Sequence, residues 1–541
     1  MSRYPSTISV VVLVLVCVAP LAQGAARPSA SSSADPDEIA APAADRAPPA
    51  ALTTLPERVL RIAHALGVPE SGISVWVQEL GGEAPLLTHL SEQLRNPAST
   101  MKLVTTFAAL QGLSPAWRWK TEVHALGPIR DGVLEGDLLL RGYGDPYLVA
   151  EEYWKLVGAV RQLGVRRIEG DLVLDSSWFE LVPESPGSFD NQPDRVYNLP
   201  PNALLVNFNA VRFRFLPDST GRGVRVLADP ELPNVDIDNR LGLVRQGCFG
   251  YQRGVALNVV DSSVDAARNR DRVMLEGRFP ASCDEYSMTR TVLAPESYAF
   301  GLFDVYWRQL GGELVGDWRR GTLPPELPAM AADGDGEAAE APATATAEGN
   351  PAQGTLAQST LLHVHRSRPL GDIVRLVNKY SNNVMTRHLQ LTLGAERFGA
   401  PATEANGNAA IREVLARYGV PLDGLVIDNP SGLSRDARLS ARQLGTLLAA
   451  AWDAPYMPEF MSSLSLAGLD GTVRNRFVGE PEAGRMHLKT GTMDDVSAIA
   501  GYVHARDGRR YAVVVIVNAP DAHRGPGEEI QDALLGWVYR R

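Results

Sequence analysis

Cysteine is scarce in this chain: only Cys17, Cys248 and Cys283 occur among 541 residues. Because Cys17 lies in an N-terminal segment with the features of a cleaved signal, two cysteines remain, too few for a cysteine-ligated metal site. In an oxidising compartment these two would close a disulfide across a 35-residue span; otherwise they are unpaired buried thiols, and the sequence leaves both open. His363 and His365 have no cysteine or carboxylate beside them, so we interpret them as surface histidines rather than metal ligands.

Positive charge and long apolar runs are also lacking. The formal net charge is −11 at pH 7, from 52 basic and 63 acidic residues, which argues against a nucleic-acid partner. Beyond the N-terminal segment, no apolar stretch approaches the roughly 18 residues of a membrane-spanning helix, so we expect no transmembrane segment in the mature chain. With 45% hydrophobic residues, the chain can bury large cores and should form more than one domain.

Residues 1–24 have the pattern of a secretory signal. Arg3 is the only charge there, Ile8–Val18 is almost wholly apolar, and Ala22-Gln23-Gly24 places small residues at a cleavage position. The alternative, an uncleaved membrane anchor, is disfavoured because the apolar run is short. We therefore predict a signal peptide that directs export.

Two polar, low-complexity segments divide the remaining sequence. Residues 25–54 are rich in Ala, Pro, Ser and Asp and are predicted to be a disordered linker. Residues 323–358 carry many acidic residues but no lysine or arginine, which predicts a second, acidic linker. The strand-rich residues 121–322 are predicted to be an insertion into one split domain, formed by residues 55–120 and 359–541.

Periodicity predicts an α/β (α+β) fold for the split domain, with an antiparallel sheet flanked by helices. Strand patterns cover residues 73–77, a stretch ending near 90, 487–491, 496–503 and 511–517. Helical patterns cover residues 56–66, 370–393, 409–418, 441–452 and 528–539. In the insertion, we expect a helix at 151–163 and strands at 133–141, 168–175, 211–215, 224–228 and 273–279.

Ser99 and Lys102 stand three residues apart at the start of an apolar helical stripe. Positions i and i+3 of a helix share a face, so the hydroxyl and the amine would lie together near a helix N-terminus. A lysine can activate a serine hydroxyl when burial or a second cation favours its neutral form. Taken alone, the pair fits a capping serine and a solvated lysine better.

Two further groups of polar residues follow. Ser381 and Asn383 lie in a helical stretch where a break would turn both into a cleft, the serine to relay a proton and the amide to bind a peptide carbonyl. Lys489-Thr490-Gly491-Thr492 lies on a strand, where the glycine permits close backbone approach and the other side chains can bind a carboxylate. Each group alone has an ordinary explanation: a polar interruption of a helix, or a strand end with a solvated lysine.

Together the groups occur in the order Ser-x-x-Lys, Ser-x-Asn, Lys-Thr-Gly, the motif set of penicillin-binding proteins and β-lactamases. A far longer stretch separates Ser99 from Ser381 than in simple β-lactamases. The chain thereby resembles the D-alanyl-D-alanine carboxypeptidase/endopeptidase family, the low-molecular-mass class C penicillin-binding proteins of the penicillin-binding protein 4 type (peptidase family S13). Further matches to the family are Gly144–Leu148, Asn378–Asn383, Asp428–Arg435 and Leu466–Arg474.

The resemblance implies a β-lactamase/transpeptidase-like domain with a large strand-rich insertion, and acyl transfer through a serine ester. Ser99 would attack the carbonyl between two D-alanines, and Lys102 would be its general base. Ser381 would pass a proton to the leaving amine, and Asn383 would hold the substrate backbone. Lys489 nearby would favour the neutral form of Lys102 by like-charge repulsion.

The resemblance also implies a carboxylate site and an oxyanion hole. Residues 489–492 would bind the terminal carboxylate, and the backbone N–H groups of Ser99 and Thr492 would form the oxyanion hole. Arg435 would contact substrate or else make a structural ion pair. The implied substrates are peptidoglycan stem peptides, cleaved in the periplasm as a carboxypeptidase, as an endopeptidase on cross-links, or as both. β-Lactam antibiotics would be covalent inhibitors, and no cofactor or metal is expected.

Two other functions were weighed against this one. A β-lactamase needs a fast deacylating base, and Glu404 with Asn408 fits a Glu-x-x-x-Asn pattern. We place that pattern in a Gly/Asn-rich loop and interpret it as chance. A catalytically silent cell-wall binding protein is disfavoured because a binding module needs no nucleophile such as Ser99.

Overall fold

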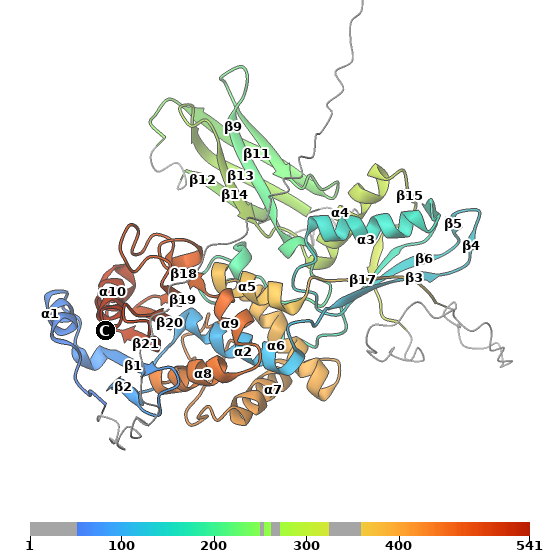
Figure 1. Ribbon diagram of the computed structural model, residues 1–541. Helices are drawn as coiled ribbons and strands as arrows, with labels where there is room; N and C mark the ends of the chain where they lie inside the picture. Colours follow the sequence, from blue (N-terminus) through green and yellow to red (C-terminus); the bar gives the residue numbers. More distant parts are fainter. Residues whose placement is uncertain (1–50, 249–253, 261–270, 324–358) are drawn as a thin grey trace, which may run out of the picture. The chain divides into compact units, whose positions relative to one another are not determined.

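The computed structural model describes residues 51–248, 254–260, 271–323 and 359–541 (Figure 1). The predicted signal peptide, most of the first linker and nearly all of the acidic linker lie outside these residues. Ordered structure begins earlier than residue 55, because the N–H of Leu52 donates to the carbonyl of Leu86 at 2.9 Å. Among the described helices, none combines the length and the apolar character that crossing a membrane requires.

A six-stranded antiparallel sheet forms the centre of the split domain, in the order β18-β19-β20-β21-β1-β2. Its strands are β1 (Ile73–Glu79), β2 (Pro85–His89), β18 (Ser465–Leu466), β19 (Met486–Met493), β20 (Val496–His504) and β21 (Arg510–Asn518). The predicted meander of β19, β20 and β21 is present, and β1 joins it by pairing Val75 with Val515. Segments near both ends of the sequence therefore build one sheet.

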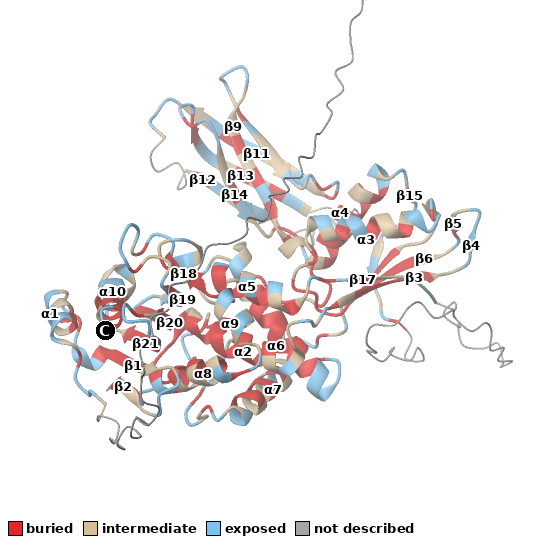
Figure 2. Cartoon of the chain, viewed as in Figure 1, coloured by how far each residue is buried: buried red, intermediate tan, exposed pale blue. Residues whose placement is uncertain are grey.

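Helices pack on both faces of this sheet, so its central strands β20 and β21 are buried except at their ends (Figure 2). Val513, Val515 and Val517 of β21 share a core with α1 (Glu57–Ala65) and α10 (Pro526–Tyr539). The intervening residues of β21 belong to the opposite core, with α2 (Lys102–Leu113). A strand covered on both faces reads as a continuous apolar run, as β21 does. The other helices of the second core are α5 (Leu370–Tyr380), α6 (Asn383–Phe398), α7 (Glu404–Arg417), α8 (Ala441–Asp453) and α9 (Met457–Ser463).

Two helices differ from the periodic pattern. The helix predicted at 370–393 is broken at Ser381, which adopts a left-handed conformation (φ 57°), and Asn382 caps α6 by accepting from the N–H of Met385. Helix α7 begins at Glu404, because the Thr403 side chain caps it, so the placement of Glu404 and Asn408 in a loop was wrong.

The insertion consists of several sheets and two helices. Helices α3 (Ala150–Gln162) and α4 (Pro295–Gln309) lie against a five-stranded sheet, β16-β8-β6-β3-β17, and share its core. Smaller sheets have the orders β15-β7-β5-β4, β10-β9-β14 and β11-β13-β12. The strands are β3 (Lys120–Leu126), β4 (Ile129–Arg130), β5 (Val133–Leu134), β6 (Asp137–Gly142), β7 (Arg167–Ile168), β8 (Leu172–Asp175), β9 (Val211–Pro217), β10 (Val224–Asp229), β11 (Val235–Val244), β12 (Val255–Val260), β13 (Asp271–Pro280), β14 (Tyr286–Arg290), β15 (Glu313–Leu314), β16 (Trp318–Arg320) and β17 (Thr360–Arg366).

Strand β17 shows that the insertion extends beyond the acidic linker. It pairs antiparallel with β3, placing Arg366 opposite Lys120, although the sequence pattern assigned residues 359–366 to the split domain. His365 on this strand is buried, with its Nε2 atom 3.5 Å from a carboxylate oxygen of Glu152. The interpretation of His365 as a surface histidine was therefore wrong.

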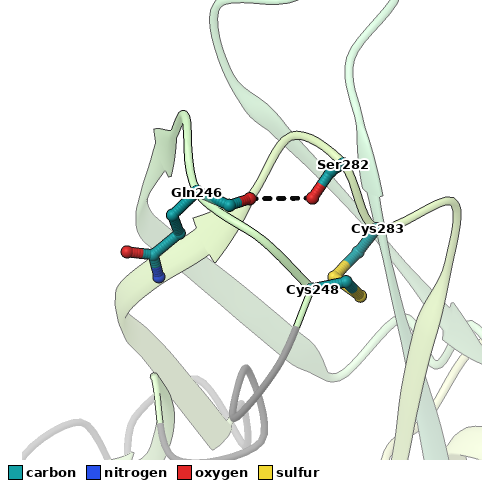
Figure 3. Close-up of a disulfide and its surroundings, with 4 residues drawn as sticks. All are labelled: Gln246, Cys248, Ser282 and Cys283. Carbon is teal, nitrogen blue, oxygen red and sulfur yellow. Dashed lines mark hydrogen bonds between the residues drawn. A yellow bond between two sulfur atoms is a disulfide. The ribbon is translucent and has the colours of Figure 1, made fainter.

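The two remaining cysteines form a disulfide. Cys248, after β11, is bonded to Cys283, between β13 and β14, and their Cα atoms are 5.2 Å apart (Figure 3). Beside it, the hydroxyl of Ser282 donates to the carbonyl of Gln246 at 2.7 Å. The alternative of two unpaired thiols, left open by the sequence, is excluded.

Candidate active site

Ser99 lies in a 3-10 turn, Ala98–Met101, that leads directly into α2. The turn is fixed by Asn96, whose Oδ1 accepts from the N–H of Ala98 at 2.9 Å and whose Nδ2 donates to the carbonyl of Ser434 at 2.8 Å. The N–H of Asn96 also donates to Oδ1 of Asn518 at the end of β21 (2.8 Å). Ser99 is thus anchored to the central sheet and is itself partly exposed.

Lys102 opens α2 one turn later and is completely buried. Its Nζ lies 2.7 Å from Oδ1 of Asn383, 2.6 Å from the carbonyl oxygen of Ser431 and 3.0 Å from Oγ of Ser99. The first two oxygens can only accept. A neutral amine has two N–H groups and one lone pair, so donating to both leaves the lone pair directed at the Ser99 hydroxyl. This is the geometry of a general base poised over its nucleophile.

The electrostatics favour that neutral amine. Burial, and then the positive charge of Lys489, hold the pKa of Lys102 well below its usual value of 10.5. Burial also lowers the pKa of Lys489, to about 7. Keeping both buried amines charged would cost free energy, because each loses its hydration and the two like charges repel. Repulsion from Lys489 lowers the pKa of Lys102 in addition to burial.

Ser381 and Lys489 form the second half of the site. Ser381 occupies the left-handed turn between α5 and α6, which explains why it and Asn383 both reach the cleft from a broken helix. Lys489, on β19, places its Nζ 3.0 Å from Oγ of Ser381 and 2.7 Å from the carbonyl of Thr490. The helix break at Ser381 and strand β19, both predicted from the sequence, are therefore in contact.

Gly491 joins the two halves. A Cβ atom at this position would lie 2.6 Å from the carbonyl oxygen of Pro97 and 2.9 Å from the nitrogen of Ser99, so only glycine lets β19 approach Ser99 this closely. Strand β19 pairs with β20 along one edge, and along its other edge it pairs with β18 only at His487 and Leu488. Among the described strands, none pairs there with residues 489–493, which leaves an open edge for an extended ligand.

The turn Asn429–Gly432 is a part of the site to which sequence reasoning assigned no role. Asn429 Oδ1 accepts from both N–H and Oγ of Ser431, at 3.0 and 2.7 Å, and so presents the Ser431 carbonyl to Lys102. Gly432 has φ +79°, and a Cβ there would lie 1.9 Å from the carbonyl oxygen of Ala98. The family match over residues 428–435 was the signal that could have found this turn.

The insertion also reaches the site. The Asn383 amide spans two neighbours: its oxygen accepts from Lys102, and its Nδ2 donates to the carbonyl of Tyr197 at 3.2 Å. Tyr197 belongs to the inserted segment, where no sequence signal marked it. The insertion therefore helps to orient a side chain that contacts Lys102.

Arg435 is an exposed residue that follows the turn Asn429–Gly432. Its guanidinium is 3.4 Å from Asp494 and stacks over the ring of Phe189 at 5.2 Å. It also lines a cavity of about 370 Å³ with Asn96 and Met493. The structure thus contains the ion pair that was one alternative for Arg435, and its contact with substrate stays a prediction.

Glu404 is paired with a side chain outside this group. Its carboxylate is 2.7 Å from the buried guanidinium of Arg387, which also pairs with Glu184 of the insertion. This pairing accounts for Glu404 without a role as a deacylating base. Within the described ranges, no group of three or more His, Cys, Asp or Glu side chains is arranged to hold a metal ion.

Comparisons with known proteins agree with this geometry. A family model described as the D-Ala-D-Ala carboxypeptidase 3 (S13) family matches residues 60–333 and 347–540. A D-alanyl-D-alanine carboxypeptidase of Actinomadura sp. (strain R39) is 32% identical over 507 residues, 92% of this chain and 86% of the relative. A D-alanyl-D-alanine carboxypeptidase DacB of Haemophilus influenzae is 24% identical over 424 residues, 78% of this chain and 80% of the relative.

Solved structures share the fold. Penicillin binding protein 4 of Haemophilus influenzae has a TM-score of 0.70 at 22% identity, over 89% of this chain and 99% of that protein. The same protein in complex with a novel β-lactam has a TM-score of 0.68 at 20% identity, over 90% and 100%. The predicted arrangement of a sheet flanked by helices with a large insertion is thus a fold that is already known.

Proposed function

The chain belongs to the S13 family of D-Ala-D-Ala carboxypeptidases and is a serine-type D,D-peptidase, and we propose that Ser99 is its nucleophile. The observation that carries this assignment is the environment of Lys102. Its Nζ lies 2.7 and 2.6 Å from two oxygens that can only accept and 3.0 Å from Oγ of Ser99, so a neutral amine that donates to those two oxygens would direct its lone pair at the Ser99 hydroxyl. A hydroxyl so placed can lose its proton as its oxygen attacks.

Acylation follows from these positions. The Ser99 oxygen attacks the carbonyl carbon between two D-alanines while the hydroxyl proton passes to Lys102. The backbone N–H groups of Ser99 and Thr492 face the developing oxyanion. Ser381 passes its proton to the leaving nitrogen and is restored by the proton that Lys102 took up. The peptide bond breaks, D-alanine leaves and an ester to Ser99 remains.

Hydrolysis completes the cycle. Water attacks the ester carbonyl, Lys102 accepts its proton and returns it to the Ser99 oxygen, and a peptide shortened by one D-alanine is released. In a cross-link, the leaving amine also carries a neighbouring carboxylate. The same carboxylate-binding edge, residues 489–492, would therefore serve endopeptidase cleavage of peptidoglycan cross-links.

The test is release of free D-alanine from a peptide that ends in D-Ala-D-Ala. Wild-type protein should release it, and Ser99→Ala should lower the rate by at least about a thousandfold, because nucleophile and base act as a unit. Equal release of D-alanine by the wild type and by Ser99→Ala would contradict the assignment of Ser99 as the nucleophile. Thr220→Val, which changes an exposed threonine of the insertion, is the matched control.

β-Lactams are the proposed inhibitors. The Haemophilus influenzae relative has been solved with a β-lactam, and a penicillin presents a strained amide beside a carboxylate, as the D-Ala-D-Ala end does. Penicillin should therefore acylate Ser99. The same Ser99→Ala variant, incubated with labelled penicillin, should remain unlabelled.

We further propose export to the periplasm. The signal pattern at residues 1–24 supports this, and so does the Cys248–Cys283 disulfide, because such bonds persist in oxidising compartments. Cell fractionation and N-terminal sequencing should find the protein in the periplasm without residues 1–24. Protein that keeps residues 1–24 in the cytoplasmic fraction would contradict the proposal.

A further inference from the structure

We propose that Thr472 is a positioning residue for the substrate carboxylate, which it serves by holding the hydroxyl of Thr490. The inference rests on the proposed function, because that carboxylate belongs to the D,D-substrate. The hydroxyl of Thr490, on β19, donates to Oγ1 of Thr472 at 2.8 Å. Thr472 lies in the 3-10 turn Gly471–Val473 and is exposed, on the edge of β19 beyond the end of β18.

The chemistry of hydroxyl groups gives this contact its meaning. A hydroxyl has one proton to donate and lone pairs to accept with, whereas a carboxylate can only accept. When Thr490 donates to a carboxylate, its proton is no longer available to Thr472. Thr472 can then turn its own proton toward the oxygen of Thr490, so the pair stays bonded and Thr490 donates outward. Such a chain strengthens each bond in it, and a valine of the same shape cannot form it.

The turn that carries Thr472 is held rigidly. The N–H of Thr472 donates to Oγ of Ser465 at 3.2 Å. Gly471 has φ +60°, and a Cβ there would lie 2.1 Å from the same Oγ atom, so the turn requires glycine. Asp470 accepts from the N–H of Leu466 at 2.7 Å. Thr472 therefore has little freedom to move away from Thr490.

A buried lysine connects this turn to the catalytic residues. Lys379 places its Nζ 2.5 Å from Asp470 and 2.9 Å from the carbonyl of Leu464, and its side chain is almost wholly buried. Lys379 stands two residues before Ser381, at the end of α5. The Lys379–Asp470 pair thus fixes the Thr472 turn relative to the group proposed to protonate the leaving amine.

The experiment compares two peptides, one that ends in D-Ala-D-Ala and one in which that terminus is an amide. Loss of the Thr472 hydroxyl should weaken the charge-assisted bond from Thr490 to the carboxylate. We expect Thr472→Val to raise KM for the free acid about tenfold, with a much smaller change in kcat, and to leave kcat/KM for the amide unchanged. Thr472→Ser keeps the hydroxyl and should restore wild-type KM.

The comparison of the two peptides can contradict the role proposed for Thr472. A loss of equal size on acid and amide, or no loss on either, would overturn the role of Thr472. If Thr472→Val lowers the melting temperature, Thr472→Ala supplies a second variant for the same acid-to-amide comparison. Wild-type protein that cleaves neither peptide would instead contradict the proposed function, so the two failures are distinguishable.

Discussion

Replacing Lys102 with methionine should lower both D-alanine release and acylation by penicillin by about a thousandfold or more. Methionine is of similar length and apolar, so it fills the buried position. It removes the amine that lies 3.0 Å from Oγ of Ser99 and that we propose to take up the proton of Ser99. Ser99 would remain in place but would keep its proton, and an un-ionised serine is a weak nucleophile. Rates with labelled penicillin measure this step directly.

The pH profile of the wild type is the companion measurement. Because burial and Lys489 lower the pKa of Lys102, kcat/KM should rise with pH through a value well below 10.5. Lys102→Met should lack this limb. A wild-type limb near 10.5 would mean that Lys102 is an ammonium ion at neutral pH, contrary to the mechanism. Lys120→Met removes a lysine that bonds Glu122 in the insertion and should leave the profile unchanged.

Replacing Gly432 with alanine should lower the acylation rate by about a hundredfold, although Gly432 touches no substrate in the proposed mechanism. The added Cβ would lie 1.9 Å from the carbonyl oxygen of Ala98 and 3.0 Å from the nitrogen of Ser99. Both are backbone atoms, so the turn must shift. The shift would move the Ser431 carbonyl away from Lys102 and displace Ser99. Penicillin acylation rate and thermal unfolding measure the two consequences.

Gly419→Ala is the matched control for this prediction. Gly419 also has a positive φ, +70°, but no atom lies within 4 Å of the position of its Cβ. It should therefore cost only the backbone strain, about 1 kcal/mol, and leave the acylation rate unchanged. If Gly432→Ala acylates as fast as Gly419→Ala, close packing against Ser99 is not what Gly432 provides.

The sequence was most informative where chemistry demands particular residue types. Ser99, Lys102, Ser381, Asn383 and Lys489 were all identified from motif order, and the structure brings all five together. The meander of β19 to β21 was equally readable, since strands covered on both faces are continuous apolar runs. Each of these motifs and strands is a pattern within a short stretch of sequence, so residue spacing is enough to identify it.

The sequence-based predictions were wrong or incomplete where contacts between segments determine the local structure. The start of α7 depends on one capping side chain, Thr403, and β17 is a strand of the insertion only because it pairs with β3. Strands β11 and β12 and helix α4 carry no pattern that was recognised. The contact of Tyr197 with Asn383 joins segments far apart in the chain, so no local signal identifies it. Thr472 lies within the family match at Leu466–Arg474, but its contact with Thr490 becomes visible only in the folded chain.

The sequence by itself determined the family and the reaction class, and it singled out the side chains that we propose to be reactive, because these depend on residue type and order. Only the tertiary structure decided whether the lysine can act as a base. Enclosure of Lys102, two acceptors for its N–H groups and the charge of Lys489 come from four separate segments of the chain. A pKa is a property of surroundings, and folding alone assembles the surroundings of Lys102.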